Sequence, residues 1–296
     1  MKLFDLHSDT LYEAYHRKIS PVSSELLQAP LGISPFDETY RVSAIWCNKA
    51  LDDESAWNAY HAIWDSSQNA LAKEALPQNV SLIHAVEDAR LLNGNLDRLE
   101  TLCRNGTRIL TLTWQGLSSV GGAWDTDEGL TDFGKALVRS AKALPLILDI
   151  SHASEKTARK TLAISEQCDV PVTASHSVSL AVCPHRRNLS DYLFDALAER
   201  GAPVGISMVS DHLNGNMTAT LDTLLSHIAH FLSRKNGEYT LAIGSDFDGT
   251  DRLPEGISSL NDLPKLYAAI ANAFSKPIAD KIFFENAHTY FTKQTV

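Results

Sequence analysis

The chain has 296 residues, 44% of them hydrophobic and 21% charged, with a formal net charge of −10 at pH 7. This composition is typical of a globular protein, and the acidic balance argues against nucleic acid or an anionic membrane as a partner. Four cysteines without paired spacing argue against a disulfide framework and against a thiolate metal site.

Eight apolar, β-branched runs alternate with amphipathic stretches along the chain. The predicted strands span 2–6, 42–47, 80–87, 108–113, 146–152, 170–176, 203–208 and 240–246. A helical stretch starts at Leu11, and the other predicted helices span 56–76, 96–104, 132–144, 154–165, 190–199, 221–234, 260–274 and 279–291. The alternation indicates parallel pairing, and eight repeats favour an α/β fold of the closed (β/α)8 barrel type over a doubly wound open sheet.

No change of composition and no linker divides the chain, so residues 1–296 are predicted to form a single domain. The first strand follows Met1 directly, and the last residues, 290–296, are few and polar. We therefore expect no export signal or membrane anchor, and a cytoplasmic location. Two loops, 114–131 and 211–217, are predicted to lie over the barrel mouth, and the first, which carries Trp114, could roof a site.

The first strand runs into His7 and Asp9, two positions apart. In an extended chain such residues point the same way, so an imidazole and a carboxylate would face one point as a metal-ligand pair. The alternative is a core histidine beside an aspartate that caps the following helix.

Further polar side chains end other predicted strands: Glu87, His152, His176, and Asp246 with Asp248. Singly, each has an ordinary explanation, such as a helix N-terminal acid, a core histidine or a turn-forming aspartate. The carboxyl ends of barrel strands converge on one mouth, however, and buried unpaired charge is costly. Together these residues predict a metal site.

Nitrogen and oxygen ligands without sulfur suit zinc or another late first-row dication, and Glu87 is the natural bridge between two ions. Zinc lowers the pKa of a bound water from 15.7 to about 7, so a metal-bridging hydroxide could act as the nucleophile. Asp246 could take its proton and pass it to a leaving amine, and Asp248 could do so instead.

Two arginines, Arg186 and Arg187, follow the sixth strand. Two dications would leave the centre weakly positive, which favours an anionic substrate, and an arginine fork suits a carboxylate. The alternative is a pair of solvated surface arginines.

At this point the sequence resembles the membrane (renal) dipeptidase family of binuclear zinc peptidases, among the amidohydrolase-like barrels. The motifs that carry the resemblance are DLHSD at 5–9, VE at 86–87, GTRILTLT at 106–113, LDISHAS at 148–154, SHS at 175–177, HRRN at 185–188, GSDFDG at 244–249 and PEG at 254–256. They occur in order and cover nearly the whole chain.

The resemblance implies specific roles. His7 and Asp9 would bind one zinc, His152 and His176 would bind the other, and Glu87 would bridge the two ions. Arg187 would hold the substrate's C-terminal carboxylate, and Asp246 would handle the proton. The implied substrates are dipeptides, including those with a D-residue on the C-terminal side, and the implied assembly is a homodimer.

One position departs from the family. Where its members usually have a histidine that contacts the scissile carbonyl, this chain has Trp114. An indole offers one neutral N–H, and the loss of an oxyanion donor typically costs about 10²–10³ in rate. Three readings stay open: a dipeptidase, a hydrolase of another small amide or N-acyl amino acid, and a metal-binding barrel with weak or no peptidase activity.

Overall fold

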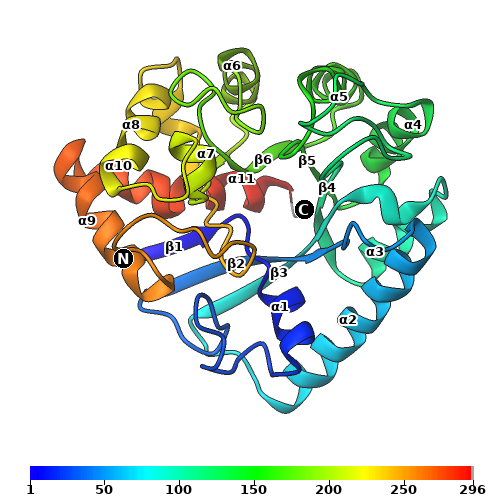
Figure 1. The fold of residues 1–296 in the computed structure, drawn as a ribbon, viewed down its shortest axis with the longest axis horizontal. Helices are drawn as coiled ribbons and strands as arrows, with labels where there is room; N and C mark the ends of the chain where they lie inside the picture. The colour runs from blue at the N-terminus through cyan, green and yellow to red at the C-terminus, as the bar shows by residue number, and fades with distance from the viewer. Residues whose placement is uncertain (295–296) are drawn as a thin grey trace.

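The computed structural model describes residues 1–294, and its centre is a closed barrel of eight parallel strands (Figure 1). The strands are β1 (Lys2–Asp5), β2 (Glu38–Trp46), β3 (Val80–Glu87), β4 (Thr107–Thr111), β5 (Ile147–Asp149), β6 (Val172–Ser177), β7 (Val204–Ile206) and β8 (Leu241–Ile243). They pair in chain order, and β1 closes the barrel on β8 through Asp5 and Ile243. The predicted (β/α)8 barrel is confirmed.

Helices follow the strands and cover the outside of the barrel. They are α1 (Thr10–Arg17), α2 (Asp53–Lys73), α3 (Asp97–Arg104), α4 (Asp132–Ser140), α5 (Glu155–Cys168), α6 (Asp191–Glu199), α7 (Ser210–Asn214), α8 (Leu221–Leu232), α9 (Leu263–Ala273), α10 (Lys276–Asp280) and α11 (Asn286–Gln294). Side-chain oxygens cap several N-termini: Asp52 accepts from the Ser55 N–H and Ser154 from the Thr157 N–H. The last predicted helix, 279–291, is broken, because Lys281–Glu285 forms a π-helical turn between α10 and α11.

All eight strands occur where the sequence predicts them, but two strands end earlier than predicted, before functional residues. β5 ends at Asp149 rather than at 152, and β8 ends at Ile243 rather than at 246. His152 and Asp246 therefore lie beyond the strands, and their φ of 65° and 61° places both in the left-handed region. α7 was also not predicted: it occupies part of the expected loop 211–217.

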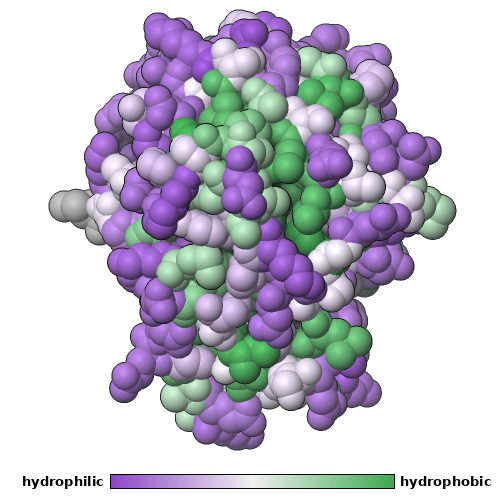
Figure 2. Space-filling model, turned by 90° about the vertical axis from the view of Figure 1, so that its left-hand side faces the viewer, coloured by the Kyte–Doolittle hydropathy of each residue, from purple (hydrophilic) through white to green (hydrophobic). Residues whose placement is uncertain are grey.

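The apolar core lies between strands and helices, and the strands are apolar on both faces because helices cover them outside. The barrel interior also holds charge: Arg41 of β2 is buried, with its Nε 3.5 Å from Oδ2 of Asp5. One outer face, at the left of Figure 1, is mainly hydrophilic with smaller hydrophobic areas (Figure 2). Across residues 1–294, no helix has the length and apolar character needed to cross a bilayer.

Candidate metal centre

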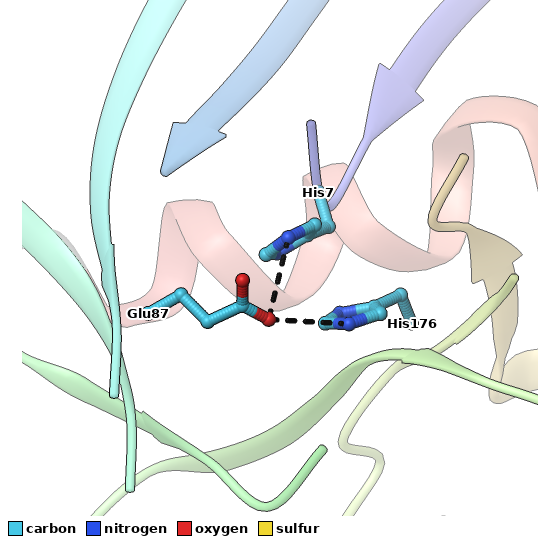
Figure 3. Close-up of side chains that lie close together, drawn as sticks. All are labelled: His7, Glu87 and His176. Carbon is cyan, nitrogen blue, oxygen red and sulfur yellow. Dashed lines mark ion pairs between the residues drawn. The ribbon is translucent and has the colours of Figure 1, made fainter. Parts of the chain in front are cut away.

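Three histidines surround one carboxylate oxygen at the carboxyl end of the barrel. Oε1 of Glu87 lies 3.0 Å from Nε2 of His152, 3.4 Å from Nε2 of His176 and 3.7 Å from Nε2 of His7. Figure 3 shows Glu87 reaching from β3 toward His7 and His176, which lie on the opposite side of the mouth. Asp9 joins them through Oδ2, 3.6 Å from Nε2 of His7. The structure therefore brings together all five residues predicted as metal ligands.

Each of these side chains is held by the end of a strand. Glu87 and His176 belong to β3 and β6, whereas His7 and Asp9 follow β1 and His152 follows β5. Asp9 precedes α1 without capping it, because its side chain accepts no hydrogen bond from the helix. The helix-cap explanation for Asp9 is therefore wrong, and its carboxylate faces the histidines.

The cluster has the electrostatics of a cation site. Nε2 of His7, Oδ1 of Asp9 and Oε1 of Glu87 are buried and have no hydrogen-bond partner among the described residues. Burial lowers the pKa of His7, but the Glu87 and Asp9 charges outweigh it and raise that pKa to about 10. Burial also raises the pKa of Glu87 well above its usual value. Excess carboxylate with unpaired lone pairs is what divalent ions neutralise, so the residues present fit a metal centre.

A buried network fixes the orientation of His176. The Asp149 carboxylate accepts hydrogen bonds from the hydroxyl groups of Ser175 (2.6 Å) and Thr111 (2.7 Å), and from the Ser151 and Ser175 N–H groups (2.9 Å each). Because Ser175 gives its only proton to Asp149, its oxygen accepts from Nδ1 of His176 at 2.8 Å. Nε2 of His176 then presents a lone pair to the cluster, the tautomer that a metal ligand needs.

A second network of the same design lies across the barrel, below His7. Asp5 accepts hydrogen bonds from the Ser245 N–H (2.8 Å) and hydroxyl (2.6 Å), as Asp149 does from Ser175. The Ser245 hydroxyl oxygen is also 3.1 Å from the His7 carbonyl oxygen. Both sides of the ligand cluster therefore rest on a buried aspartate and serine.

The two aspartates after β8 have different surroundings. Oδ1 of Asp246 is 3.9 Å from Nε2 of His7, and its Oδ2 is 4.0 Å from Nε2 of His176. Asp248 faces away from the histidines, because its Oδ2 accepts a hydrogen bond of 2.7 Å from the Thr10 hydroxyl. Burial raises the pKa of each carboxyl to about 6. Between the two, the geometry favours Asp246 as the acid–base group.

The two predicted arginines also differ. Arg186 is exposed and pairs with Asp127, 2.6 Å away, as expected of a surface arginine. Arg187 is buried: its guanidinium donates to the Ser177 hydroxyl (3.3 Å) and the His176 carbonyl (3.0 Å), and its Nε has no partner among the described residues. Arg187 thus retains free donors beside the cluster.

A cavity of ≈ 290 Å3 opens onto the cluster and has an aromatic wall. Trp114, predicted to replace a histidine, lies in this wall with its ring 4.8 Å from that of Trp46 and 5.9 Å from that of His152. Its loop does cover the site, and Asp125 braces the loop by accepting the Gly116 N–H at 2.7 Å. A larger cavity, ≈ 950 Å3, lies beside the amino ends of β3, β5 and β6, away from these ligands.

Sequence reasoning missed several cavity residues, namely Tyr12, Trp46, Val209, His212, Gly249 and Thr250. Two of them had a usable signal. Trp46 is the last residue of β2, and His212 follows β7, a strand for which no polar end residue had been assigned. Both lie at or after the carboxyl end of a strand, where barrel side chains converge on one mouth.

Comparisons with known proteins agree with this geometry. The model of the membrane dipeptidase family, peptidase family M19, matches residues 58–293. Among solved structures, a metallopeptidase described as dipeptidase AC is 24% identical with a TM-score of 0.83, over 99% of this chain and 98% of that one.

Two further structures share the fold. A metallopeptidase from Rhodobacter sphaeroides, liganded with a phosphinate mimic of the dipeptide L-Ala-D-Ala, is 24% identical with a TM-score of 0.80, over 99% of both chains. An amidohydrolase from Pseudomonas aeruginosa is 16% identical with a TM-score of 0.77, over 99% of this chain and 96% of that one.

Proposed function

The chain belongs to the membrane dipeptidase family, peptidase family M19, and from this premise we propose that it is a zinc-dependent dipeptidase with a two-metal centre. Membership of the family makes the protein an enzyme, a metallo-dipeptidase. The proposal adds the number and identity of the ions, the roles of the residues, and the acceptance of a C-terminal D-residue.

One observation carries the proposal. Three imidazole nitrogens lie within 3.0–3.7 Å of a single oxygen of Glu87, and that oxygen has no hydrogen-bond partner among the described residues. We assign His7 and Asp9 to one ion, His152 and His176 to the other, and Glu87 to both. Nitrogen and oxygen ligands without sulfur favour zinc, although other divalent metals suit the same ligands.

When bound, the ions would supply Lewis acidity and would lower the pKa of a coordinated water from 15.7 to about 7, which would make a nucleophile available at neutral pH. The chain's own residues do the rest. Asp246 lies within 4.0 Å of two ligand nitrogens and its pKa is raised to about 6, so at neutral pH its carboxylate can take a proton and pass it to the leaving amine.

Substrate recognition would rest on Arg187, whose free donors suit a C-terminal carboxylate. The cavity of ≈ 290 Å3 suits a ligand of dipeptide size, because it lies near the lower limit for small-molecule sites. The relative from Rhodobacter sphaeroides holds a mimic of L-Ala-D-Ala, which supports testing dipeptides of that stereochemistry.

The experiment is a hydrolysis assay with purified, zinc-loaded protein on L,L- and L,D-dipeptides, with and without a chelator. We expect cleavage of at least one dipeptide, its loss on chelation and its return with zinc. Metal-loaded protein that is inert on the whole panel would reject the proposal.

Trp114 favours a second candidate, a hydrolase of another small amide or N-acyl amino acid, or a metal-binding barrel with little peptidase activity. Its indole stands in the cavity wall beside His152, where it cannot carry positive charge. The Trp114→His variant separates the candidates. A gain in dipeptide cleavage, by up to about 10²-fold, supports an attenuated dipeptidase. No gain, together with cleavage of N-acyl amino acids, supports the second candidate.

A further inference from the structure

His212 lines the cavity but has no function in the proposed metal centre. It lies on α7, after β7, and lines the same cavity as Arg187 and Asp246. Its ring packs against His185 with centroids 5.1 Å apart, and its ring nitrogens make no hydrogen bond to any described residue. His212 is partly buried and lines the cavity, so its uncommitted ring N–H can donate a hydrogen bond to a ligand there.

The backbone around His212 is held firmly, although α7 has only five residues. The Asn188 amide donates to the His212 carbonyl at 2.7 Å, and Nε2 of His227 donates to the neighbouring Leu213 carbonyl at 2.8 Å. The Ser210 N–H donates to the Arg252 carbonyl, also at 2.8 Å. These contacts connect α7 to three other segments, so the backbone that carries the His212 ring is held in place.

The charges near His212 decide which kind of group it can bind. Burial, with the Arg187 charge next in size, lowers the pKa of His212 to about 2, so the ring is neutral at working pH. A neutral imidazole beside a guanidinium adds a hydrogen-bond donor without adding charge repulsion. Of the carboxyl groups that line the cavity, Asp9 and Glu87 are assigned to the metal ions, Asp246 to proton transfer, and Asp248 accepts a hydrogen bond from Thr10.

We propose that His212 donates a hydrogen bond to the substrate's C-terminal carboxylate, beside Arg187, and so determines specificity for dipeptides with a free carboxylate. The inference rests on the proposed dipeptidase function. An arginine fork satisfies only part of a carboxylate's hydrogen-bonding capacity, and the N–H of His212 would occupy one of the remaining lone pairs.

The test compares His212→Phe, which keeps an aromatic ring without a donor, with His212→Gln, which keeps a donor. The control is His230→Phe, a histidine of α8 that pairs with Asp191 outside the cavity. For zinc-loaded protein, KM and kcat are measured on L-Ala-D-Ala and on its C-terminal amide. Binding of the phosphinate mimic of L-Ala-D-Ala is measured by calorimetry as a readout without turnover.

We expect His212→Phe to raise KM for the dipeptide and Kd for the mimic by roughly 10–100-fold, the usual value of a hydrogen bond to a charged group. The amide should change little, His212→Gln should recover much of the loss, and His230→Phe should match wild type. If His212→Phe does not fold, His212→Leu, which also lacks a donor, gives the same comparison.

Equal effects on peptide and amide would overturn the carboxylate role, and so would a fall in kcat with unchanged KM and Kd, which would put His212 at the scissile carbonyl. Wild-type protein that neither cleaves the dipeptide nor binds the mimic is a different result. It rejects the proposed function before any variant is compared.

Discussion

His176 presents Nε2 to the cluster because Ser175 accepts a hydrogen bond from its Nδ1, and Asp149 in turn holds the Ser175 hydroxyl. We expect Ser175→Ala to lower zinc affinity by about 10–100-fold, since groups that orient a ligating histidine have effects of this size. Competition titration of zinc against a chelator measures it. The control is Ser67→Ala, a buried serine of α2 whose hydroxyl, among residues 1–294, donates only to the Ile63 carbonyl. Equal affinities for the two variants would contradict the orienting role.

The two neighbouring arginines provide a matched pair for the carboxylate assignment. Arg187→Met removes a buried guanidinium beside the cluster, whereas Arg186→Met removes an exposed one paired with Asp127. We expect Arg187→Met to raise KM for a free dipeptide by roughly 10²-fold, because the variant loses the charged hydrogen bonds to the substrate carboxylate. The KM for the C-terminal amide should rise far less, because the amide has no carboxylate. Steady-state kinetics of the variants measure both values. Equal effects on peptide and amide would remove Arg187 from this role.

His84 of β3 makes the stability of the protein depend on pH, away from the metal centre. Burial and the Arg108 charge lower its pKa from 6.5 to about 4, and its Nδ1 has no partner among the described residues. Between pH 6.5 and 4 the unfolded chain therefore binds a proton that the native protein does not. Native stability falls as pH drops through this range, by up to about 1.4 kcal/mol per pH unit from this residue.

The His84→Phe variant should lack this contribution. Urea unfolding of metal-free protein at pH 7 and pH 5 measures the change in stability for both proteins. Wild type should lose more stability on acidification than the variant, whereas from pH 9 to pH 8, where His84 is neutral in both states, the two should change alike. The same loss in both proteins at pH 5 would contradict the assignment.

For individual residues, the sequence predicted which side chains come together at the metal centre, but not the hydrogen bonds that they make. His7, Glu87 and His176 were found because each ends a strand, and barrel strands end at one mouth. The choice between Asp246 and Asp248 could not be made, because it depends on a contact between Asp248 and Thr10 of another segment. His212 was missed because the sequence does not show that its ring lies near Arg187 in the folded protein.

At the scale of elements, β6, β7 and β8 approach one another too closely for side chains at two positions. A Cβ on Gly205 or Gly244 would lie 1.9 or 2.0 Å from the carbonyl oxygen of Ser175, the residue before the ligand His176. Glycine at both positions lets the strands converge below the metal centre.

We therefore expect Gly244→Ala to destabilise the protein by roughly 3 kcal/mol, the upper part of the range for overpacking, because the clash is with backbone. Gly129→Ala is the control, since its Cβ would meet only Lys156 at 3.6 Å. Urea midpoints of both variants against wild type measure the difference. A Gly244→Ala midpoint equal to that of the control would contradict this packing.

Strand order and helix positions were predictable because apolar periodicity reports burial directly. Strand ends were less predictable. The sequence predicts strands up to His152 and Asp246, yet the strands end at Asp149 and Ile243, and His152 and Asp246 adopt left-handed conformations at the mouth. Such local strain is common at functional sites, and no periodicity signals it. α7 was missed for a related reason, because five residues are too few to show a helical period.

At the scale of the whole molecule, the barrel gathers residues from near both ends of the chain into one cavity. His7 and Asp246 are far apart in sequence, yet their side chains lie 3.9 Å apart because β1 pairs with β8. The protein carries a net charge of −10, and three of its carboxyl groups, those of Asp9, Glu87 and Asp246, lie together at this cavity. Bound cations balance this local charge, so the account depends on metal binding more than on any other single property.

The most direct test is calorimetric titration of metal-free protein with zinc, for wild type and for Glu87→Gln, which leaves the shape of the side chain but removes its charge. We expect two ions per chain in wild type, and in the variant a clear loss of affinity or of one ion. Wild-type protein that binds no zinc, or that binds it equally well without the Glu87 charge, would contradict the account.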